Sequence, residues 1–481
     1  MTADDLSIPT LVGLSIGIAV VGLIAGRWLS RRTGWAPAGG TALLVATPIV
    51  PFVPVVSGVS LDDILPLLGI AFLAAAVDLG RLRRVKVPWL LVVGVALAVG
   101  AGVASSLANA SSPGQAVTML LRSPGRYAFL TVIVVLVALT EPPDRRGALT
   151  ARAMALLGTA EAVFGLAAFF LPLGGLGLEP TRKFSVLYFE VPGRIAGTLG
   201  ISPNFLGAIF ILTIVVTTGL AIEARTGRDR VVLWSSVLVQ MLALTLTFTR
   251  ASLGVAIVGV AVLLLLRGRI RYLVPVLCVV AIGFATTPSR TAPPGTPGSE
   301  GPRAPVAVER LTSDIPDRLA LWYSATLMML DHPLTGVGPG RTVAVAAGDR
   351  DRYVHTPVGA AENNAHNTIL LAGAELGVAG ALGALLVNLA IGLAALGILL
   401  RSRRGATVAE TAGAVAVLGY LAQGMVNNLF NVAAASVVFA VVVGAWVIRL
   451  ETGSPSASQP NADDQAQRQR APTGTPLEPI R

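Results

Sequence analysis

Long apolar runs, each of about 15–20 residues and separated by short loops that carry arginine, recur along this sequence. Because an α-helix rises 1.5 Å per residue, a run of about 20 apolar residues crosses the ~30 Å hydrocarbon core of a bilayer. A membrane β-barrel would instead show alternating polarity in segments of ~10 residues, and none is evident. The runs therefore predict an all-α, polytopic integral membrane protein with about 12–13 transmembrane helices.

The charged residues are too few to cover a soluble domain. They make up 13% of this chain, whereas roughly 25% is usual for soluble domains. The formal net charge of +10 is spread over short loops, so we expect membrane lipids as surroundings and no nucleic-acid partner. Cys278 is the single cysteine, which excludes a disulfide within the chain.

The apolar runs define a set of predicted spans. The first stretch, MTADDLS, is acidic and lacks a basic segment. The first run is therefore predicted to be a permanent span and not a cleaved signal peptide. The weakest span contains Pro48, Pro51 and Pro54. The predicted spans lie near residues 8–26, 39–56, 64–79, 87–105, 127–140, 152–171, 203–222, 231–249, 251–266, 272–286, 369–400, 408–426 and 429–448.

Basic loops set the predicted orientation, because arginine and lysine gather on the cytoplasmic side of a membrane protein. With these spans, the basic clusters all fall on one side, and removing the span at 39–56 would divide them. The N-terminus is then outside and the C-terminal tail inside, in a multi-pass protein of the cytoplasmic membrane. The clusters begin at Arg27, Arg81, Arg145, Arg225, Arg267 and Arg401.

Residues 1–451 are predicted to form one membrane domain, and residues 452–481 a disordered cytoplasmic tail. The longest loop, 287–367, falls outside the cell, and its Pro/Gly-rich part, 287–312, is predicted to be flexible. The run from 369 to 400 is too long for one untilted span, so its first turns are expected at or above the outer interface. Apolar residues at helical spacing predict an amphipathic helix on the membrane surface: Leu319, Trp322, Tyr323 and Leu327.

Three arginines on the predicted outer face are candidates for binding a ligand. Arg250 lies between two apolar runs with almost no loop, where an arginine is costly unless it faces protein or an anion. The alternative is that Arg250 extends to the outer headgroups. Arg318 is the second candidate, and a solvated loop arginine near Asp314 or Asp317 is its alternative. Arg194 lies in the external loop 172–202.

Three asparagines surround a histidine at the start of a long apolar helix. Asn363, Asn364 and Asn367 flank His366, one of three histidines in the chain. This cluster is a candidate for catalysis and for binding a ligand. The alternatives remain a histidine that bonds the backbone at a helix start, and asparagines that serve as N-caps or turn residues.

Other polar features have weaker functional interpretations. Asp349 and Asp351 form a pair that suits a divalent metal, but the interleaved arginines favour a solvated charge run. The stretch GVGPG at 336–340 is not followed by Lys-Ser/Thr, so it predicts a turn and not a P-loop. Glu161, inside an apolar run, is either a proton site or a partner in a hydrogen bond between helices. No metal site and no cofactor are predicted.

Four stretches in a fixed order resemble the O-antigen ligase family of bacterial polysaccharide ligases and polymerases. They are PGRIAGTLGISPN, TFTRASLG, DRLALWYSATLMMLDHPLTGVGPG and AHNTILLAGAELGVAGAL, and they extend over about residues 190–400. The resemblance implies a membrane glycosyltransferase of the GT-C type, which takes a glycan from a polyprenyl diphosphate and joins it to an acceptor hydroxyl. The family usually has both termini in the cytoplasm, whereas the basic loops here predict an external N-terminus.

The resemblance also implies roles for individual residues. His366 matches the general base, Arg318 and Arg250 match arginines that hold the diphosphate, and Arg194 and Trp322 lie in the matching motifs. Arginines suit a diphosphate leaving group because they donate paired, charge-assisted hydrogen bonds and can replace a metal ion. A histidine with an ordinary pKa near 6.5 is often neutral at pH 7 and can accept a proton.

A transporter or flippase of a lipid-linked saccharide is the alternative function. A transporter places polar or broken helices near the middle of the membrane. Here the unusual residues, apart from Glu161, lie at or beyond the outer edge, which favours an enzyme. The donor sugar and the acceptor, whether glycan, lipid or protein hydroxyl, are not encoded in any recognisable pattern.

The helix after His366 contains small residues at a spacing that allows close packing. Gly373, Gly377 and Gly380 predict a close approach of another helix or of lipid there.

Overall fold

The structure is a computed structural model, and it describes most of the membrane domain. The described residues are 8–49, 54–56, 59–77, 87–140, 147–171, 195, 203–286, 306–355, 365–402, 405–431 and 433–448. Residues 287–305 of the predicted flexible stretch, the tail after 451, Arg194, Asn363 and Asn364 lie outside them. The rest of that stretch, 306–312, forms the start of a helix.

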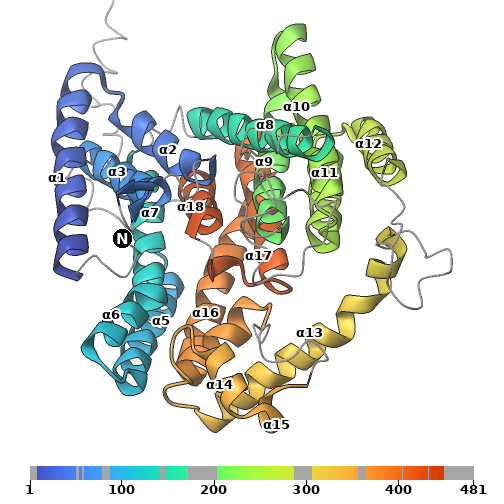
Figure 1. Ribbon diagram of the computed structural model, residues 1–481. Coiled ribbons are helices and arrows are strands. Elements are labelled where there is room, and N and C mark those ends of the chain that lie inside the picture. Colours follow the sequence, from blue (N-terminus) through green and yellow to red (C-terminus); the bar gives the residue numbers. More distant parts are fainter. Residues whose placement is uncertain are drawn as a thin grey trace, which may run out of the picture.

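The N-terminal part of the chain contains seven of the helices in Figure 1 and one pair of short antiparallel strands. The strands are β1 (Pro54–Val56) and β2 (Val59–Ser60). The helices are α1 (Ile8–Thr33), α2 (Ala36–Ala46), α3 (Leu61–Ala76), α5 (Trp89–Asn109), α6 (Pro113–Arg122), α7 (Pro124–Thr140) and α8 (Ala148–Phe170).

The C-terminal part contains the helices on which the candidate site residues lie. They are α9 (Pro203–Glu223), α10 (Gly227–Leu246), α11 (Arg250–Leu266), α12 (Leu273–Ala285), α13 (Val306–Asp331), α14 (Thr342–Gly348), α15 (Arg350–Tyr353), α16 (Thr368–Arg401), α17 (Val408–Gly424) and α18 (Ala433–Val442). Short 3-10 or π segments are η2 (Thr47–Ile49), η4 (Ile270–Tyr272), η6 (Leu429–Asn431) and η7 (Val443–Val447).

The helical content confirms the predicted class, an all-α polytopic membrane protein. Among the described residues, six segments are long and apolar enough to cross a membrane: α5, α6–α7, α8, α9, α10 and α16. Helices α2, α3, α11, α12 and α18 are apolar but shorter. The exact number of spans stays a prediction, because length and composition alone define these segments.

The second predicted span, 39–56, differs from the structure. Helix α2 ends at Ala46, a 3-10 turn follows, and Pro54 already belongs to strand β1. Proline has no backbone N–H and clashes with the preceding helical turn, so Pro48 stops the helix early. The outer loop before residue 127 contains a short helix, α6, which the apolar pattern did not predict.

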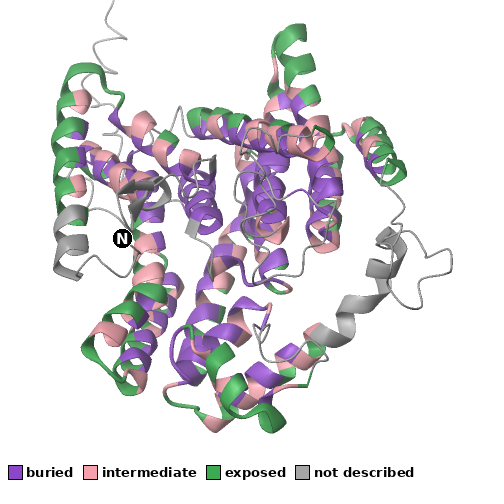
Figure 2. Ribbon diagram, in the orientation of Figure 1, coloured by how far each residue is buried: buried purple, intermediate pink, exposed green. Residues whose placement is uncertain are grey.

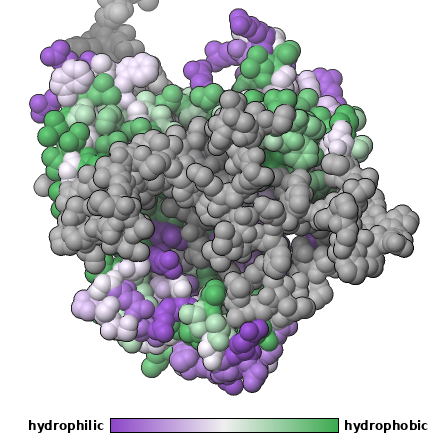
Figure 3. All heavy atoms as spheres, viewed as in Figure 1, coloured by the Kyte–Doolittle hydropathy of each residue, from purple (hydrophilic) through white to green (hydrophobic). Residues whose placement is uncertain are grey.

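The two ends of the molecule differ in polarity. Figure 3 shows hydrophilic residues at the top and the bottom, with hydrophobic residues between them. In Figure 1 the C-terminal end of α1 and the N-terminal end of α10 point upward, while α6 and α13–α15 lie at the bottom. The top therefore corresponds to the predicted cytoplasmic side and the bottom to the predicted outer side.

Helix α9 forms the centre of the core (Figure 2). Almost every residue from Leu206 to Thr218 is buried, because α8, α10, α11, α17 and α18 pack around it. Many large apolar residues elsewhere are exposed, such as Leu156 on α8 and Leu265 on α11. In a bilayer these side chains face lipid, so the core and the lipid face are both apolar. Glu161 on α8 is fully buried.

Helix α16 is broken near its outer end. Gly377 has φ 77° and ψ −172°, a backbone region that is essentially restricted to glycine. The break divides α16 into a short outer segment before Gly377 and a long inner segment after it. The predicted run from 369 to 400 was too long for one span, and this break accounts for the excess. Gly377 thus allows a break in the backbone. The small-residue spacing had predicted only a close approach of a helix or lipid at this glycine.

Candidate active site

Two non-glycine residues in the described part of the chain have positive φ angles. They are Phe248, with φ 51°, and His366, with φ 43°. Such backbone conformations cost free energy and persist where surrounding contacts hold them, often at functional sites. Phe248 lies two residues before Arg250, and His366 is the predicted base. Strained backbone therefore marks both stretches that the motifs had singled out.

Hydrogen bonds fix the turn that carries Arg250. Arg250 is the first residue of α11, directly after the turn that links α10 to α11. The backbone N–H of Thr249 donates to Thr247 Oγ1 over 3.2 Å, and Thr249 Oγ1 donates to the carbonyl of Pro203 over 3.2 Å. The Arg250 side chain is half-buried. The turn is thus tied to the start of α9.

The PGRIAG stretch lies against the same turn. Ile195 is buried, and its backbone N–H donates to the carbonyl of Leu246, at the end of α10, over 3.1 Å. Two motifs that are about fifty residues apart in the sequence are therefore neighbours in the fold. Arg194 lies outside the described residues, but its neighbour Ile195 is fixed next to the turn that carries Arg250.

Asn367 caps helix α16. Its Oδ1 accepts hydrogen bonds from the backbone N–H groups of Ile369 and Leu370 at 2.9 and 3.0 Å. Its Nδ2 donates to the carbonyl of Met425 over 2.9 Å, and the side chain is buried. Asn367 therefore has the N-cap arrangement that the sequence left open as an alternative to sugar binding. The cap holds His366, which is half-buried, at the start of the helix.

The last turn of α17 joins the two halves of the candidate site. Gln423 Nε2 donates to Ser252 Oγ over 2.8 Å, two residues after Arg250. The next residue, Gly424, accepts a hydrogen bond from Thr368 Oγ1 over 3.1 Å, two residues after His366. The starts of α11 and α16 thus share one support, which places the stretches of Arg250 and His366 at the same end of the molecule.

Helix α13 carries Arg318 and Trp322 one turn apart. The predicted amphipathic helix is present, but its buried face contains Leu321, Ala325 and Met328, while Leu319 and Tyr323 are exposed. Trp322 Nε1 is buried and has no hydrogen-bond partner among the residues that the structure describes. This face of α13 packs against the outer segment of α16 and the residue before His366: Leu371, Ala374 and Ala365.

A polar cluster closes the C-terminal end of α13. Arg352 forms a salt bridge with Asp331, and the hydroxyl of Tyr353 donates to Asp331 Oδ2 over 2.7 Å. The hydrogen bonds from Arg352 and then Tyr353 lower the pKa of Asp331 to about 2. Asp349 accepts from the backbone N–H of Arg352 as the cap of α15, and Asp351 is exposed. The pair at 349 and 351 therefore lies in a capped, exposed charge run.

The HPLTGVGPG stretch docks on the break in α16. The backbone N–H groups of Val337 and Gly338 donate to the carbonyls of Ala374 and Glu375 at 2.9 and 3.1 Å. Beyond the break, the N–H of Val378 donates to the carbonyl of Pro333 over 2.8 Å. These carbonyls and this N–H lack their usual helical partners at the break, so residues 333–338 replace those partners.

The side chain of Glu375 adds to the same contact. Its Oε1 accepts from the backbone N–H of Gly340 over 2.9 Å, and its carbonyl accepts from Ser105 Oγ over 2.7 Å. Glycine is required at 336, because a Cβ there would lie 2.3 Å from the Glu375 carbonyl carbon. The stretch 333–340 thus fixes α13, which precedes it, to α16 and α5.

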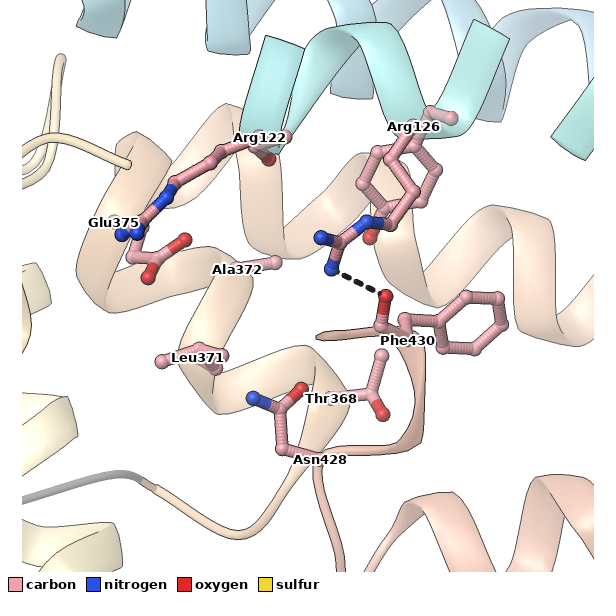
Figure 4. Close-up of a pocket in the computed structure, with 10 residues that line it drawn as sticks. Arg122, Arg126, Thr368, Leu371, Ala372, Glu375, Asn428 and Phe430 are labelled. Carbon is pink, nitrogen blue, oxygen red and sulfur yellow. Dashed lines mark hydrogen bonds between the residues drawn. The ribbon is translucent and has the colours of Figure 1, made fainter. Parts of the chain in front are cut away.

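Sequence reasoning did not identify a polar pocket beside α16, next to the docked stretch. Arg122, Arg126, Glu375 and Asn428 line it, together with Thr368 and other residues (Figure 4). Arg122 and Arg126 come from the α6–α7 corner and reach toward α16. The sequence does contain a signal for this pocket. Two arginines lie close together on the predicted outer side, where positive charge is disfavoured.

Comparison with known families supplies the deciding observation. The model of the O-antigen ligase family matches residues 231–385. Over these residues the chain is similar to the O-antigen ligase family. No curated protein matches the chain. The resemblance inferred from the four motifs is therefore confirmed at the level of the family.

The matched segment of the O-antigen ligase family runs from α10 to the middle of α16. It contains Arg250, Arg318, Trp322 and His366, whereas Arg194 lies before it. It also contains the break at Gly377 and the docked stretch. This match, together with the apolar helices, supports a multi-pass membrane protein of the O-antigen ligase or polymerase type.

Proposed function

We propose that the chain transfers a glycan from a polyprenyl-diphosphate carrier to an acceptor hydroxyl on the outer face of the cytoplasmic membrane. The observation that carries the proposal is the shared support of Arg250 and His366. Hydrogen bonds from the last turn of α17 reach Ser252 and Thr368, so an arginine and a histidine from distant motifs are held at one end of the bundle.

The chemistry of such a transfer divides between these residues. The bond between the anomeric carbon and the diphosphate oxygen breaks, and the diphosphate gains negative charge. Arg250 and Arg318, with Arg194 as a third candidate, would stabilise that charge through charge-assisted hydrogen bonds. His366 would accept the proton of the acceptor hydroxyl as its oxygen bonds to the anomeric carbon.

The remaining candidates would position the substrates. Trp322 lies one helical turn from Arg318, and its buried Nε1 is a donor suited to a sugar oxygen or a phosphate oxygen. Asn363 and Asn364 remain proposed sugar ligands from the motif alone. Asn367 acts through the backbone, because its side chain caps the helix that His366 precedes.

The test is glycan transfer by purified protein with a polyprenyl-diphosphate glycan and an acceptor. We expect His366→Ala to lower kcat on the order of 10²–10⁴-fold, because a general base acts in the transition state. His332 and His355, both exposed, provide matched controls, and glutamine at either position should leave the rate unchanged. A normal rate for His366→Ala would contradict the assignment of the base.

Metal removal tests the second part of the mechanism. Arginines can neutralise the leaving group without a metal ion, so excess EDTA should leave transfer by the wild-type protein unchanged. Abolition of transfer by EDTA would contradict a metal-independent mechanism. Asp349 and Asp351 would then be the first residues to substitute.

A further inference from the structure

The pocket beside α16, here called the recess, has features that the proposed donor site does not use. Arg122, Arg126, Glu375, Asn428 and Thr368 line it, and its cavity volume is about 30 Å³. Figure 4 shows both arginines reaching from the α6–α7 corner toward α16 and the segment that follows α17. None of the four sequence motifs includes Arg122, Arg126 or Asn428.

The charges in the recess favour an anion. Arg126 Nη1 donates to the carbonyl of Phe430 over 2.6 Å, which fixes its guanidinium at the wall. Arg122 is exposed. The N-terminus of α7, a 17-residue helix, also lies at the recess and adds partial positive charge.

One buried carboxylate limits that positive charge. Glu375 interacts electrostatically with both arginines, and its Oε1 is held by the backbone N–H of Gly340. Two guanidinium groups outnumber the one carboxylate, so the lining of the recess favours an anion. The cavity volume of about 30 Å³ has room for a single oxyanion group and not for a diphosphate with its sugar.

The position of the recess relates it to the second substrate. Thr368, which lines the recess, is two residues from His366. Asn428 and Phe430 lie just beyond the last turn of α17, which on its other side bonds Ser252 near Arg250. The stretch around His366 therefore lies between the turn that carries Arg250 and the recess. A base that activates an acceptor hydroxyl must contact the acceptor, and the helix start that follows that base lines the recess through Thr368.

We infer that the recess binds the acceptor through a singly charged oxyanion, a phosphodiester or a carboxylate, with Arg122 and Arg126 as its ligands. The inference rests on the proposed function, because it takes His366 as the base between donor and acceptor. It assigns to the acceptor a property that the family match does not specify, an anionic group near the hydroxyl that is glycosylated.

Binding of small probes tests the inference without a transfer reaction. The full chain is purified in a maltoside detergent, which contains no phosphate. Dimethyl phosphate and methyl glucuronide probe the recess, and geranyl diphosphate probes the proposed donor site. Dissociation constants come from titrations followed by ³¹P NMR for the phosphates and by ligand-observed ¹H NMR for the glucuronide.

We expect Arg122→Gln and Arg126→Gln each to raise the dissociation constant of dimethyl phosphate or methyl glucuronide at least ~10-fold, because charge-assisted hydrogen bonds are lost. Binding of geranyl diphosphate should stay unchanged. Arg250→Lys should weaken the binding of geranyl diphosphate and leave the binding of the two oxyanion probes unchanged. Arg350→Gln is the matched control, because Arg350 is exposed on the same outer end of the molecule. Arg122→Gln separates binding from folding, since Arg122 is exposed whereas Arg126 holds the Phe430 carbonyl.

Three outcomes would overturn the inference. If Arg122→Gln binds both oxyanion probes as well as the wild type does, the recess is not an oxyanion-binding site. Weaker binding of geranyl diphosphate by the same variant would make the recess part of the donor site. Mass spectrometry that finds phosphatidylglycerol bound to the wild type and lost from Arg122→Gln would identify a lipid headgroup as the occupant. Normal probe binding by a protein that transfers no glycan would contradict the proposed function alone.

Discussion

At the scale of single residues, the positive φ angles of Phe248 and His366 show where the fold accepts backbone strain. Each such residue costs on the order of 1–3 kcal/mol, which neighbouring contacts must offset. Around Phe248 the threonines at 247 and 249 provide hydrogen bonds, and after His366 Asn367 provides a cap worth about 1 kcal/mol. The strain is thus supported next to both candidate catalytic positions.

The arginines provide a prediction at this scale. Arg250→Lys and Arg318→Lys keep the charge but lose the planar set of donors that binds two phosphate oxygens together. We expect kcat/KM for the lipid-linked donor to fall on the order of 10-fold or more in each variant. Glycan transfer at varied donor concentration measures the effect.

Arg350→Lys supplies the control for these variants, because Arg350 is exposed and lies outside the candidate site. Its kcat/KM should equal that of the wild type. Wild-type turnover by both Arg250→Lys and Arg318→Lys would exclude the two arginines from the site, and the diphosphate ligands would have to be sought elsewhere.

Which residues the sequence could identify depended on local pattern. Arg250 stood out because an arginine between two apolar runs is costly, and His366 because it starts an apolar helix. Arg122 and Arg126 flank a proline in a short loop, and their pocket partners come from residues 368–430. No local spacing connects these segments, so only the packing of α7 beside α16 shows that they belong together.

At the scale of elements, the break in α16 was hidden from the apolar pattern. The run from 369 to 400 is apolar throughout, and glycine is common in membrane helices. The excess length of the run was visible, but the position of the break depends on hydrogen bonds with residues 333–338, far away in the sequence. Similarly, α6 was missed because its ten residues are amphipathic and not apolar.

The break leads to a prediction about Gly377. An alanine at 377 would require a backbone region that only glycine adopts readily, and its Cβ would lie 2.5 Å from the carbonyl oxygen of Pro333. We expect Gly377→Ala to lower the free energy of unfolding by on the order of 1–3 kcal/mol and to impair transfer. Thermal unfolding in detergent and the transfer assay measure these effects.

Gly397 is the matched control in the same helix. A Cβ at 397 would meet no atom within 4 Å, and alanine is the better helix former by roughly 1 kcal/mol. Gly397→Ala should therefore be as stable as the wild type or more stable. Equal stability of the variants at 377 and 397 would show that the docked stretch does not depend on the break.

At the scale of the whole molecule, the two polar ends fit a protein that crosses the membrane, and which end faces the cytoplasm stays a prediction. Basic loops placed the N-terminus and the loop 287–367 outside, and the structure puts α6 and α13–α15 at one end, away from the arginine-bearing end of α10 (Figure 1). The class and the approximate helix positions followed from apolar length alone. The short helix α2 did not, because three prolines interrupt an otherwise apolar run.

Cysteine labelling tests this orientation. Cys278 is first replaced by serine, since it is the only cysteine and is exposed. Gly348→Cys lies in the outer layer and Gly227→Cys at the start of α10, and neither substitution meets an atom within 4 Å. We expect an impermeant maleimide to label position 348 in intact cells.

Position 227 and a cysteine at Ser454 in the tail should react only after the membrane is permeabilised. Labelling of position 227 or of the tail in intact cells would reverse the orientation. The candidate site would then face the cytoplasm, where the proposed acceptor is not expected.

The support that α17 gives to the candidate site has a consequence for biosynthesis. A ribosome that has made about 400 residues has already delivered Arg250, Arg318 and His366 to the membrane. The hydrogen bonds that link the starts of α11 and α16 involve Gln423 and Gly424, which are made later. The site is therefore completed by one of the last helices to be inserted. A chain released before α17 would contain every proposed catalytic side chain and still lack the contacts that link the stretches of Arg250 and His366.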